Sequence, residues 1–404
     1  MKKRVQNSIR TSIIALLACL CVPQMAVAST DDIETPPLIN FFLGYELTDE
    51  TATMLSRWDI VVLDMDQTYQ FPEQMKLIKR LNPDIKLIAY ISAGEINEAR
   101  FHGGLGSPGR ILADQIPEQW FLGRPSQSRI SWWPGAWLMN ATNGAPLING
   151  ERWNTFLPRY IHQELMSKGI WDGVFLDGGY SEVTSKFGAG LDINNDGIVD
   201  DPKTVDEAYR DGMKTLLQNT RKAIGDDRII IANSSLEFAQ ETNGILFENF
   251  PRYGFDWPFR SMQDISPLLE QPNVLAINTN TNNLERPNDY RLMRYGLAST
   301  LIAGGYYSFD AGDAKHHRTW WYDEYEAPIG VPNSAPKNSS GLWSRQFTNG
   351  YVIVNPTKKA ITIQLPTRYQ KLFGRQDPQI NTGEILNEVS VPPEDGLLLV
   401  KPKG

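Results

Sequence analysis

Eight short runs of apolar, β-branched and aromatic residues recur between residues 38 and 309 of this 404-residue chain. They are Leu38–Tyr45, Asp59–Met65, Ile85–Ser92, Gly173–Asp177, Arg228–Asn233, Gly244–Phe250, Asn273–Asn278 and Gly304–Phe309. Stretches with helical spacing separate several of the runs, at Asp49–Arg57, Phe71–Leu81, Trp153–Lys168, Val205–Ile224 and Arg291–Ile302. Buried strands that alternate with helices indicate a parallel sheet, and eight such units favour a closed (β/α)8 barrel over a doubly wound open sheet.

The texture of the sequence changes after this repeating part. Residues 328–341 are rich in Pro, Asn and Ser, as in a linker, and residues 342–404 contain short alternating runs between turn residues. The expected fold class is therefore α/β: a (β/α)8 TIM barrel with a small C-terminal antiparallel β-sandwich domain. The expected boundaries are 1–28 for a signal peptide, 29–327 for the barrel, 328–341 for the linker and 342–404 for the β-domain.

The N-terminus has the three parts of a secretory signal peptide. Basic residues stand at positions 2–4 and 10, an apolar run covers residues 13–21, and Ala-Val-Ala precedes Ser29. We expect a secreted or periplasmic protein. A minor alternative is that the chain is a lipoprotein, with its lipid attached to Cys19. No later stretch is long and uncharged enough to be a transmembrane segment. Cys19 and Cys21 are the only cysteines, so the mature chain is expected to be stable without disulfides.

The charge balance restricts the partners. The whole chain has 39 basic and 47 acidic residues, a net charge of −8, and removal of the four basic residues of the signal peptide leaves −12. Nucleic-acid-binding proteins present a basic face, so no nucleic-acid partner is expected. An acidic surface suits a neutral or cationic polymer, although secreted proteins are often acidic for solubility alone. We expect a monomer.

Polar residues stand at or just after the ends of the expected strands. They are Asp64, Glu95, Asp177, Asn233, Glu248, Asn278 and Asp310. The carboxyl ends of parallel strands meet at one rim of a barrel, where barrel active sites are built. A carboxylate in apolar surroundings has a raised pKa unless it is paired or hydrogen-bonded. Any one of these acids could be structural, but five acids at one rim indicate chemistry.

Two of the acids are suited to glycoside hydrolysis. That reaction uses two carboxyl groups, ~5–5.5 Å apart for retention or ~6.5–9.5 Å apart for inversion of the anomeric carbon. We interpret Asp177 and Glu248 as this pair, with Glu248 as the general acid, because a raised and an unraised carboxylate supply an acid and a base. The two glycines after Asp177 would leave space for the substrate.

Aromatic residues near the same rim suit a sugar ligand, because their flat faces stack on sugar rings while polar groups bind the hydroxyls. The expected substrate-binding residues are Asp64, Tyr90, Glu95, Trp132, Trp133, Asn233, Asn278, Asp310 and Trp320. The tryptophans of the long 95–152 loop could instead form that loop's own small core. His316 and His317 either line the cleft beside Trp320 or lie in a solvated loop.

A second long loop follows the fourth expected strand and has the oxygen pattern of a Ca²⁺ site. Acids or amides occupy loop positions one, three, five and nine, with Gly197 at position six, but Lys203 replaces the bidentate Glu of an EF-hand at position twelve. The expected ligands are Asp192, Asn194, Asp196, the carbonyl of Ile198, and Asp200 or Asp201. The alternative is a polar turn with Asx hydrogen bonds. A Ca²⁺ ion here would be structural, and no cofactor is expected for catalysis.

Three motifs resemble a known family: YISAGE at residues 90–95, WDGVFLD at residues 171–177 and FEN at residues 247–249. They are similar to the polygalactosaminidase-type (β/α)8 glycoside hydrolases and their relatives, over about residues 38–313. In that family the acid that ends strand four and a Glu on strand six are the proposed catalytic carboxylates, which correspond to Asp177 and Glu248. The resemblance implies a glycoside hydrolase, with a galactosamine-containing polymer as the substrate.

The chain departs from that family in its longer strand-three loop, in its β-domain and in Asn249, where the family tends to have Ser. The identity of the sugar in the substrate is therefore left open. The sequence predicts a secreted, metal-independent glycoside hydrolase that cleaves an extracellular or envelope polysaccharide by a two-carboxylate acid/base mechanism. Two alternatives remain: a non-catalytic glycan-binding barrel protein, and a metal-dependent polysaccharide deacetylase.

Overall fold

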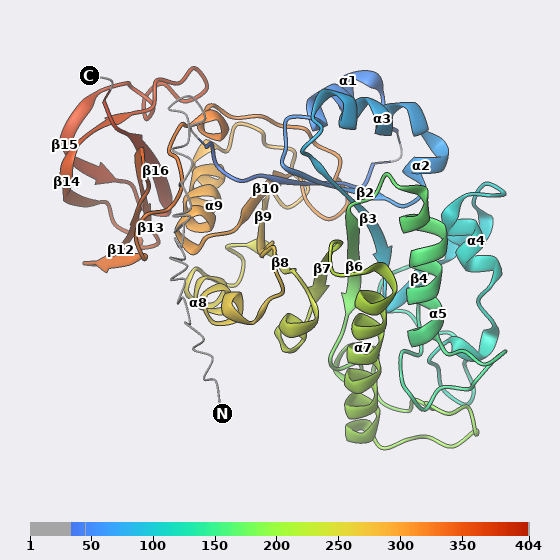
Figure 1. The fold of residues 1–404 in the computed structure, drawn as a ribbon. Coiled ribbons are helices and arrows are strands. Elements are labelled where there is room, and N and C mark those ends of the chain that lie inside the picture. Colours follow the sequence, from blue (N-terminus) through green and yellow to red (C-terminus); the bar gives the residue numbers. More distant parts are fainter. Residues whose placement is uncertain (1–33, 45, 403–404) are drawn as a thin grey trace, which may run out of the picture. The chain divides into compact units, whose positions relative to one another are not determined.

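The computed structural model describes residues 34–44 and 46–402, so the expected signal peptide at 1–28, with Cys19, lies outside the described residues. Eight parallel strands form one sheet in the order β1-β2-β3-β6-β7-β8-β9-β10 (Figure 1). Their bounds are β1 (Ile39–Phe42), β2 (Ile60–Asp64), β3 (Lys86–Ser92), β6 (Gly173–Gly179), β7 (Ile229–Ser234), β8 (Gly244–Phe250), β9 (Ala276–Asn280) and β10 (Tyr306–Asp310). All eight expected strands are present, and the predicted α/β barrel is confirmed.

The sheet curves into a nearly closed barrel, and residues just ahead of β1 join its first and last strands. Leu38 forms a parallel bridge with Tyr307 on β10, and the backbone N–H of Tyr307 donates to the carbonyl of Pro37 at 3.0 Å. The backbone N–H of Ile60 on β2 donates to the carbonyl of Leu38 at 3.2 Å, so the same short segment also continues the β1–β2 pairing.

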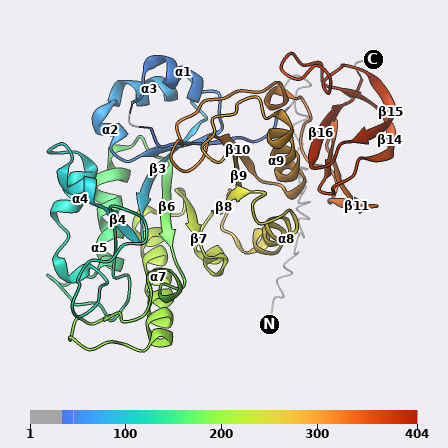
Figure 2. The same ribbon diagram turned by 180° about the vertical axis from the view of Figure 1, so that it is seen from behind.

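Nine α-helices are present in the described residues, and the longest, α7, runs beside α5 in both views (Figures 1 and 2). They are α1 (Asp49–Leu55), α2 (Gln67–Gln70), α3 (Pro72–Leu81), α4 (Pro108–Asp114), α5 (Trp153–Tyr160), α6 (Thr184–Phe187), α7 (Pro202–Ile224), α8 (Asp256–Ile265) and α9 (Tyr290–Ala303). The expected helix over 153–168 is α5 followed by a π turn and a 3₁₀ turn, and α2, α4, α6 and α8 were not among the helices expected from the sequence. No helix in residues 34–44 or 46–402 has the length and apolarity needed to cross a lipid bilayer.

Two cores face opposite sides of the strands. The barrel interior is filled by Ile39, Phe41, Ile60, Val62, Ile88, Phe175, Ile229, Ile231, Leu246, Val274 and Ala276. Intervening strand residues, such as Val61, Leu63, Val174 and Leu176, pack against the helices. Successive strand side chains point to opposite faces, so each strand contributes every second residue to the interior. This period of two decides which polar side chains reach the mouth of the barrel.

The long loop after β3 has its own small framework. Its hairpin of β4 (Glu95–Asn97) and β5 (Ala136–Leu138) places Glu95 opposite Leu138, and the 3₁₀ helix Glu98–His102 follows β4 directly.

The C-terminal part is a six-stranded antiparallel sheet that curls around its own core to form a β-sandwich-like domain. Its strands are β11 (Lys337–Ser339), β12 (Leu342–Gln346), β13 (Gly350–Asn355), β14 (Ile361–Lys371), β15 (Ile385–Val391) and β16 (Asp395–Val400). β11 lies within residues 328–341, the range expected as a linker, so part of that range is strand.

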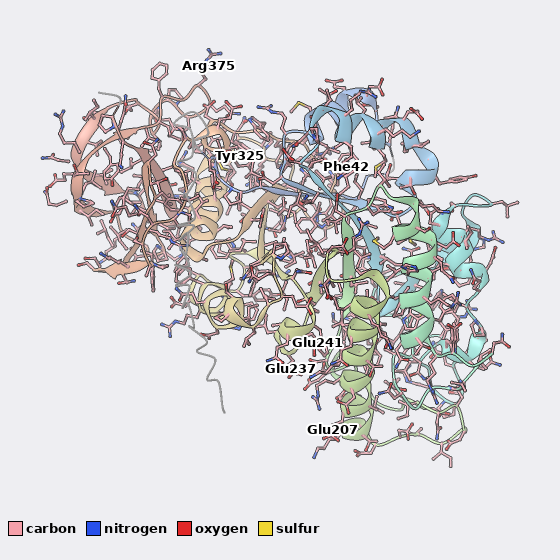
Figure 3. The ribbon with its side chains drawn as sticks, in the orientation of Figure 1. Phe42, Glu207, Glu237, Glu241, Tyr325 and Arg375 are labelled. Carbon is pink, nitrogen blue, oxygen red and sulfur yellow. The ribbon has the colours of Figure 1, made fainter. Side chains whose placement is uncertain are left out.

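In Figure 3 the labelled Phe42 and Tyr325 are buried side chains of the barrel part, whereas Glu207 and Glu237 are exposed.

The two parts are joined by a buried cluster of charges. Arg294 on α9 donates to both carboxylate oxygens of Asp395 at 3.0 Å and to Asp377 at 2.7 Å, and Glu324 lies 3.7 Å away. Beside it, Gly396 packs so closely on α9 that an added Cβ would lie 2.4 Å from the Cβ of Ala298. The sheet is therefore held against α9 by specific contacts.

Candidate functional site

Seven polar side chains follow the interior core residues at the carboxyl ends of the strands. They are Asp64, Tyr90, Asp177, Asn233, Glu248, Asn278 and Asp310. The first six each stand two residues after an interior residue of the same strand, and Asp310 stands four residues after Tyr306. Because strand side chains alternate between faces, all seven face the barrel interior at the same rim. The structure therefore brings together most of the residues expected from the sequence.

Both carboxylate oxygens of Asp177 accept hydrogen bonds. The Tyr90 hydroxyl donates to Oδ2 at 2.6 Å, and the backbone N–H of Gly178 donates to Oδ1 at 2.8 Å. Tyr90 is itself held by stacking on Phe175, with ring centroids 5.9 Å apart. Asp177 is thus oriented by its neighbours on β3 and β6.

The glycines after Asp177 meet requirements of the backbone and of strand packing, and the space that they leave for a substrate stays a prediction. Gly178 has a φ of +69°, a left-handed conformation that glycine adopts without strain. A Cβ on Gly179 would lie 2.4 Å from the Cβ of Ser234 on β7. A Cβ on Gly94 would lie 2.2 Å from the carbonyl oxygen of Gly178. The glycines therefore allow three neighbouring strand ends to pack closely.

Glu248 has different surroundings. Burial, together with the nearby charges of Asp313 and Asp177, raises the pKa of Glu248 to about 7. His316 and a 3.4 Å hydrogen bond from the Asn233 side chain oppose that shift. The Glu248 side chain is still 31% exposed, so a ligand can reach it. Near neutral pH a large fraction of Glu248 is therefore a neutral acid.

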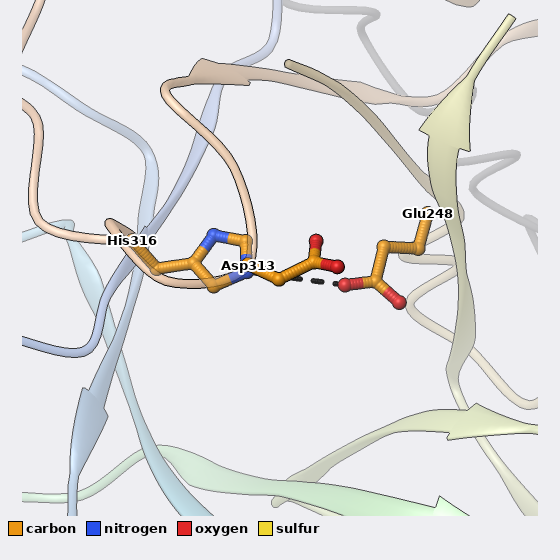
Figure 4. A group of neighbouring side chains, drawn as sticks. All are labelled: Glu248, Asp313 and His316. Carbon is orange, nitrogen blue, oxygen red and sulfur yellow. Dashed lines mark ion pairs between the residues drawn. The ribbon is translucent and has the colours of Figure 1, made fainter. Parts of the chain in front are cut away.

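His316 and Asp313, on the loop after β10, face Glu248 (Figure 4). His316 Nδ1 lies 2.6 Å from Oδ2 of Asp310, and its Nε2 lies 3.9 Å from Oε1 of Glu248. Burial opposes the charged imidazole, but Asp310, Glu248 and Asp313 together raise the pKa of His316 above its ordinary value. The His316 side chain is only 14% exposed and lies against Asp310 and Glu248, so the expectation of a solvated loop does not hold for His316.

Glu248, Asp313 and His316 also form a group with the residue types and spacing that could hold a metal ion. Within residues 34–44 and 46–402, Glu248, Asp313 and His316 are the one group of His, Asp and Glu whose donor atoms all lie within 4.8 Å of one another. Acidic groups at such spacings also interact through their titration without a metal ion.

Asp64 is engaged by Arg100, which the sequence did not single out. Arg100 donates to both oxygens of Asp64 and, at 2.7 Å, to Asp66. Burial works against the Arg100 charge, but the two aspartates raise the pKa of its guanidinium. The two ion pairs fix the 3₁₀ helix of the long loop to the end of β2, so Asp64 has an anchoring contact in addition to its place at the rim.

Glu95 lies on the loop side of the rim and is 9% exposed. Its Oε2 accepts from the Tyr180 hydroxyl at 2.9 Å, while Oε1 is buried and has no hydrogen-bond partner among the described residues. Burial raises the pKa of Glu95, against the effect of the Tyr180 hydrogen bond. Glu95 therefore has an unused acceptor close to Asp177, whose charge also contributes to its pKa.

Aromatic side chains surround Lys186 at this part of the rim. Its Nζ lies 4.3 Å above the Trp132 ring and 4.1 Å above the Tyr180 ring. Trp132 and Trp133 are tilted against each other and about half exposed, whereas Trp320 packs on Phe309 at 5.6 Å and is half-buried. Burial lowers the pKa of Lys186, against the attraction of Glu95, Asp177 and Glu248. Trp132 is thus a ring at the rim with an exposed face.

On the barrel side of the rim, Asn278 donates to Oδ2 of Asp310 at 3.1 Å, and both residues are buried. Asp310 Oδ1 has no partner among the described residues. Asn278 therefore orients the carboxyl group of Asp310, which in turn contacts Nδ1 of His316.

In the expected Ca²⁺ loop the acids accept hydrogen bonds from backbone N–H groups. Asp192 accepts from Asp196 and Gly197, and Asp200 accepts from Ile193 at 2.8 Å. The Asn194 side chain donates to Asp196 at 2.9 Å, and Ile198 is exposed. Asp201 is the N-cap of α7, because its Oδ2 accepts from the backbone N–H of Thr204 at 3.1 Å. The loop thus has the Asx turns of the alternative interpretation, and its oxygen atoms lie on one short turn.

A (β/α)8 barrel whose rim holds two interior carboxylates in contrasting surroundings has the architecture of a glycoside hydrolase. The family model described as hypothetical glycosyl hydrolase family 15 matches residues 79–351, more than half of the chain. The chain belongs to this family and is an enzyme of the glycoside hydrolase class. No curated protein matches it.

Solved structures share the fold at low sequence identity. A mutant of MutB, from crystals soaked with trehalulose, has a TM-score of 0.51 and 11% identity over 89% of this chain and 98% of that chain. The GH31 dextranase of Flavobacterium johnsoniae, complexed with glucose, has a TM-score of 0.50 and 10% identity over 91% of this chain and 52% of that chain. At these identities the likeness shows the fold.

Proposed function

We propose that the enzyme cleaves a polysaccharide with Glu248 as the general acid and Asp177 as the base or nucleophile. The observation that carries the proposal is the contrast between the two interior carboxyl groups. Burial raises the pKa of Glu248 to about 7, whereas both oxygens of Asp177 accept hydrogen bonds, from Tyr90 and Gly178. A buried acid with a raised pKa, together with a second carboxyl group that accepts hydrogen bonds at both oxygens, supplies the two different carboxyl groups that glycosidic bond cleavage needs.

The chemistry assigns one step to each group. Glu248 gives its proton to the glycosidic oxygen while the bond from the anomeric carbon to that oxygen breaks, and the bonding electrons go to the oxygen. Asp177 either attacks the anomeric carbon or takes a proton from the attacking water. Tyr90 keeps Asp177 oriented for either role, because its hydroxyl is committed to Oδ2.

We further propose that the substrate is an extracellular or envelope polysaccharide, with galactosamine-containing polymers as the first candidates. The acidic rim supports a neutral or cationic sugar, because Glu95, Asp177, Glu248, Asp310 and Asp313 are all near it. Trp132 and Trp133 would stack on sugar rings, and Trp320, Asn233 and Asn278 would complete the sugar contacts or support them. The enzyme would act as a secreted monomer.

The experiment compares glycan binding with release of reducing ends for wild type, Asp177→Asn and Glu248→Gln. We expect the rate of reducing-end release to fall by at least about 10³-fold in both variants, and glycan binding to be retained. The matched controls Asp211→Asn and Glu207→Gln change exposed acids of α7 and should behave as wild type. A wild type that binds glycan without releasing ends would establish the glycan-binding alternative instead.

Chelation addresses the deacetylase alternative. A metal-dependent enzyme would lose turnover in EDTA at temperatures where the fold persists, and it would release acetate rather than reducing ends. The proposed hydrolase keeps its turnover in EDTA.

We also propose that the 192–201 loop takes a structural Ca²⁺. Its support is the spacing of Asp192, Asn194, Asp196 and Asp200 around Gly197, which has a φ of +85° that suits a sharp turn. The ion would brace the segment between β6 and α7 and would have no part in the chemistry.

A further inference from the structure

His316 is held by its Nδ1 atom in a buried hydrogen bond. The nitrogen lies 2.6 Å from Oδ2 of Asp310, a residue that is 3% exposed, and the Asn278 side chain donates to that same oxygen at 3.1 Å. A carboxylate only accepts hydrogen bonds, so this contact favours the forms of the His316 imidazole that carry a proton on Nδ1. The second nitrogen, Nε2, is then the one that gains or loses a proton.

The backbone of the loop prevents the imidazole from moving away. The N–H of Leu43, just after β1, donates to the carbonyl of His316. The Asn283 side chain, from the loop after β9, accepts from the N–H of Ala314 at 3.0 Å. Contacts from two neighbouring strand ends therefore fix the loop that carries His316.

The free nitrogen faces Glu248. Nε2 lies 3.9 Å from Oε1 of Glu248, and Asp313 completes the group (Figure 4). The titratable groups around His316 are Asp310 from β10, Glu248 from β8, and Asp313 and His317 from its own loop. Glu248 in turn is affected by Asp313, His316 and Asp177, and Lys186 is attracted to it. His316 is the positive member of this set that lies within ion-pair distance of Glu248.

We propose that His316 is a positioning residue that presents a fixed positive charge to Oε1 of Glu248 and stabilises the carboxylate left when Glu248 protonates the departing oxygen. This inference rests on the proposed function of Glu248. In the step, the proton moves from Glu248 to the glycosidic oxygen, the bonding electrons follow to that oxygen, and His316 keeps both of its protons. The negative charge then appears where a positive charge is already in place, so little reorganisation is needed.

Asp310 makes this arrangement possible. A buried carboxylate that accepts from Nδ1 favours the imidazolium form and fixes the direction of Nε2. Asp313 acts against His316, because its negative charge favours the protonated form of Glu248. The two neighbours therefore set the proton affinity of Glu248 from opposite directions.

The first test needs no substrate. The chain has four histidines, so ¹H–¹⁵N NMR can follow each imidazole in wild-type protein. We expect His316 to titrate above its ordinary pKa and to carry its neutral-state proton on Nδ1. Asp310→Asn and Glu248→Gln should each lower that pKa, and the control His162→Gln, which changes an exposed histidine of the π turn after α5, should leave it unchanged. A neutral form with its proton on Nε2, or a pKa of His316 that is the same in wild type and in Glu248→Gln, would overturn the proposal.

The second test is the pH dependence of turnover in His316→Asn. The Asn amide can keep the bond to Asp310 while the charge next to Glu248 is lost. We expect kcat to fall by about tenfold with a small change in KM. The alkaline limb should also move to higher pH, because loss of the positive charge raises the pKa of Glu248. A loss of activity with an unmoved alkaline limb, in a variant that melts like wild type, would mark His316 as structural and overturn the proposal.

The two tests also separate this proposal from the function on which it rests. If wild-type protein hydrolyses no glycan, the proposed function fails and this role of His316 fails with it, even when the imidazole titration shows the coupling to Glu248. If hydrolysis occurs and the titration shows no coupling, only the role of His316 is overturned.

Discussion

The Tyr90 hydroxyl on β3 donates to Oδ2 of Asp177 on β6 across 2.6 Å, and this bond favours the orientation of Asp177 at the rim. We expect Tyr90→Phe to lower kcat/KM by about 10- to 100-fold, because a hydrogen bond to a charged group contributes about 1.5–3 kcal/mol. Steady-state kinetics on the polysaccharide measures the loss. Tyr351→Phe, in the C-terminal sheet, is the control, and equal losses in both variants would contradict the proposed role of Tyr90.

The positions of the rim residues follow from strand periodicity, which explains why they could be predicted. Asp177 stands two residues after Phe175 and Glu248 two after Leu246, and both apolar residues are in the interior core. Once eight parallel strands are recognised, the period of two and the shared direction of the strands bring these acids to one rim without further information.

Other contacts depend on loop paths that the spacing of residues does not determine. Arg100 reaches Asp64 from a 3₁₀ helix 36 residues further along the chain. His316 reaches Glu248 from a loop whose course is set by contacts with Leu43 and Asn283. The available signal for His316 was its place after the eighth strand. The glycines after Asp177 are explained by the close approach of the neighbouring strand at Ser234. The sequence does not show this approach, because it depends on how the two strands pack.

The pH profile should respond to Asp313, an exposed residue of the loop after β10. Its charge raises the pKa of Glu248, which is about 7, so activity should fall as pH rises through that region and Glu248 loses its proton. In Asp313→Asn the pKa of Glu248 falls, and the alkaline limb should therefore move to lower pH. Measurements of kcat against pH at low and high salt test this, since salt weakens an exposed charge interaction. A limb that stays in place at low salt would contradict the assignment of Glu248.

Trp132 should contribute to binding more than to chemistry, because it lies in the loop after β3 with an exposed face and touches Lys186 rather than the carboxylate pair. We expect Trp132→Ala to raise KM for a polymeric substrate by about tenfold and to change kcat by less than about threefold. The control is Phe373→Ala, which removes an exposed ring of the C-terminal domain. A fall in kcat without a change in KM would show that Trp132 affects the reacting groups instead.

Arg294 should be required for stability, because it is the positive centre of a buried cluster with Asp395, Asp377 and Glu324. Arg294→Met leaves those acids without their partner, and we expect it to lower the free energy of unfolding by about 3–5 kcal/mol. Urea unfolding measures the change. The double variant Arg294→Met with Asp395→Asn should recover part of the loss, since it removes an unpaired buried charge. Additive losses in the double variant would argue against the ion pair as the cause.

Removal of Ca²⁺ should affect stability and leave turnover intact. If the 192–201 loop binds the ion, then Ca²⁺ at 100 times its dissociation constant stabilises the folded protein by about 2.7 kcal/mol, and EDTA lowers the melting temperature. Asp192→Asn should abolish this difference between Ca²⁺ and EDTA. Asp201→Asn should keep it, because Asp201 already caps α7 through the N–H of Thr204, and asparagine is about as good an N-cap. Melting curves that coincide in Ca²⁺ and EDTA would show that the loop is held by its Asx hydrogen bonds alone, with Asp192 accepting from Gly197 at 2.8 Å as the main contact.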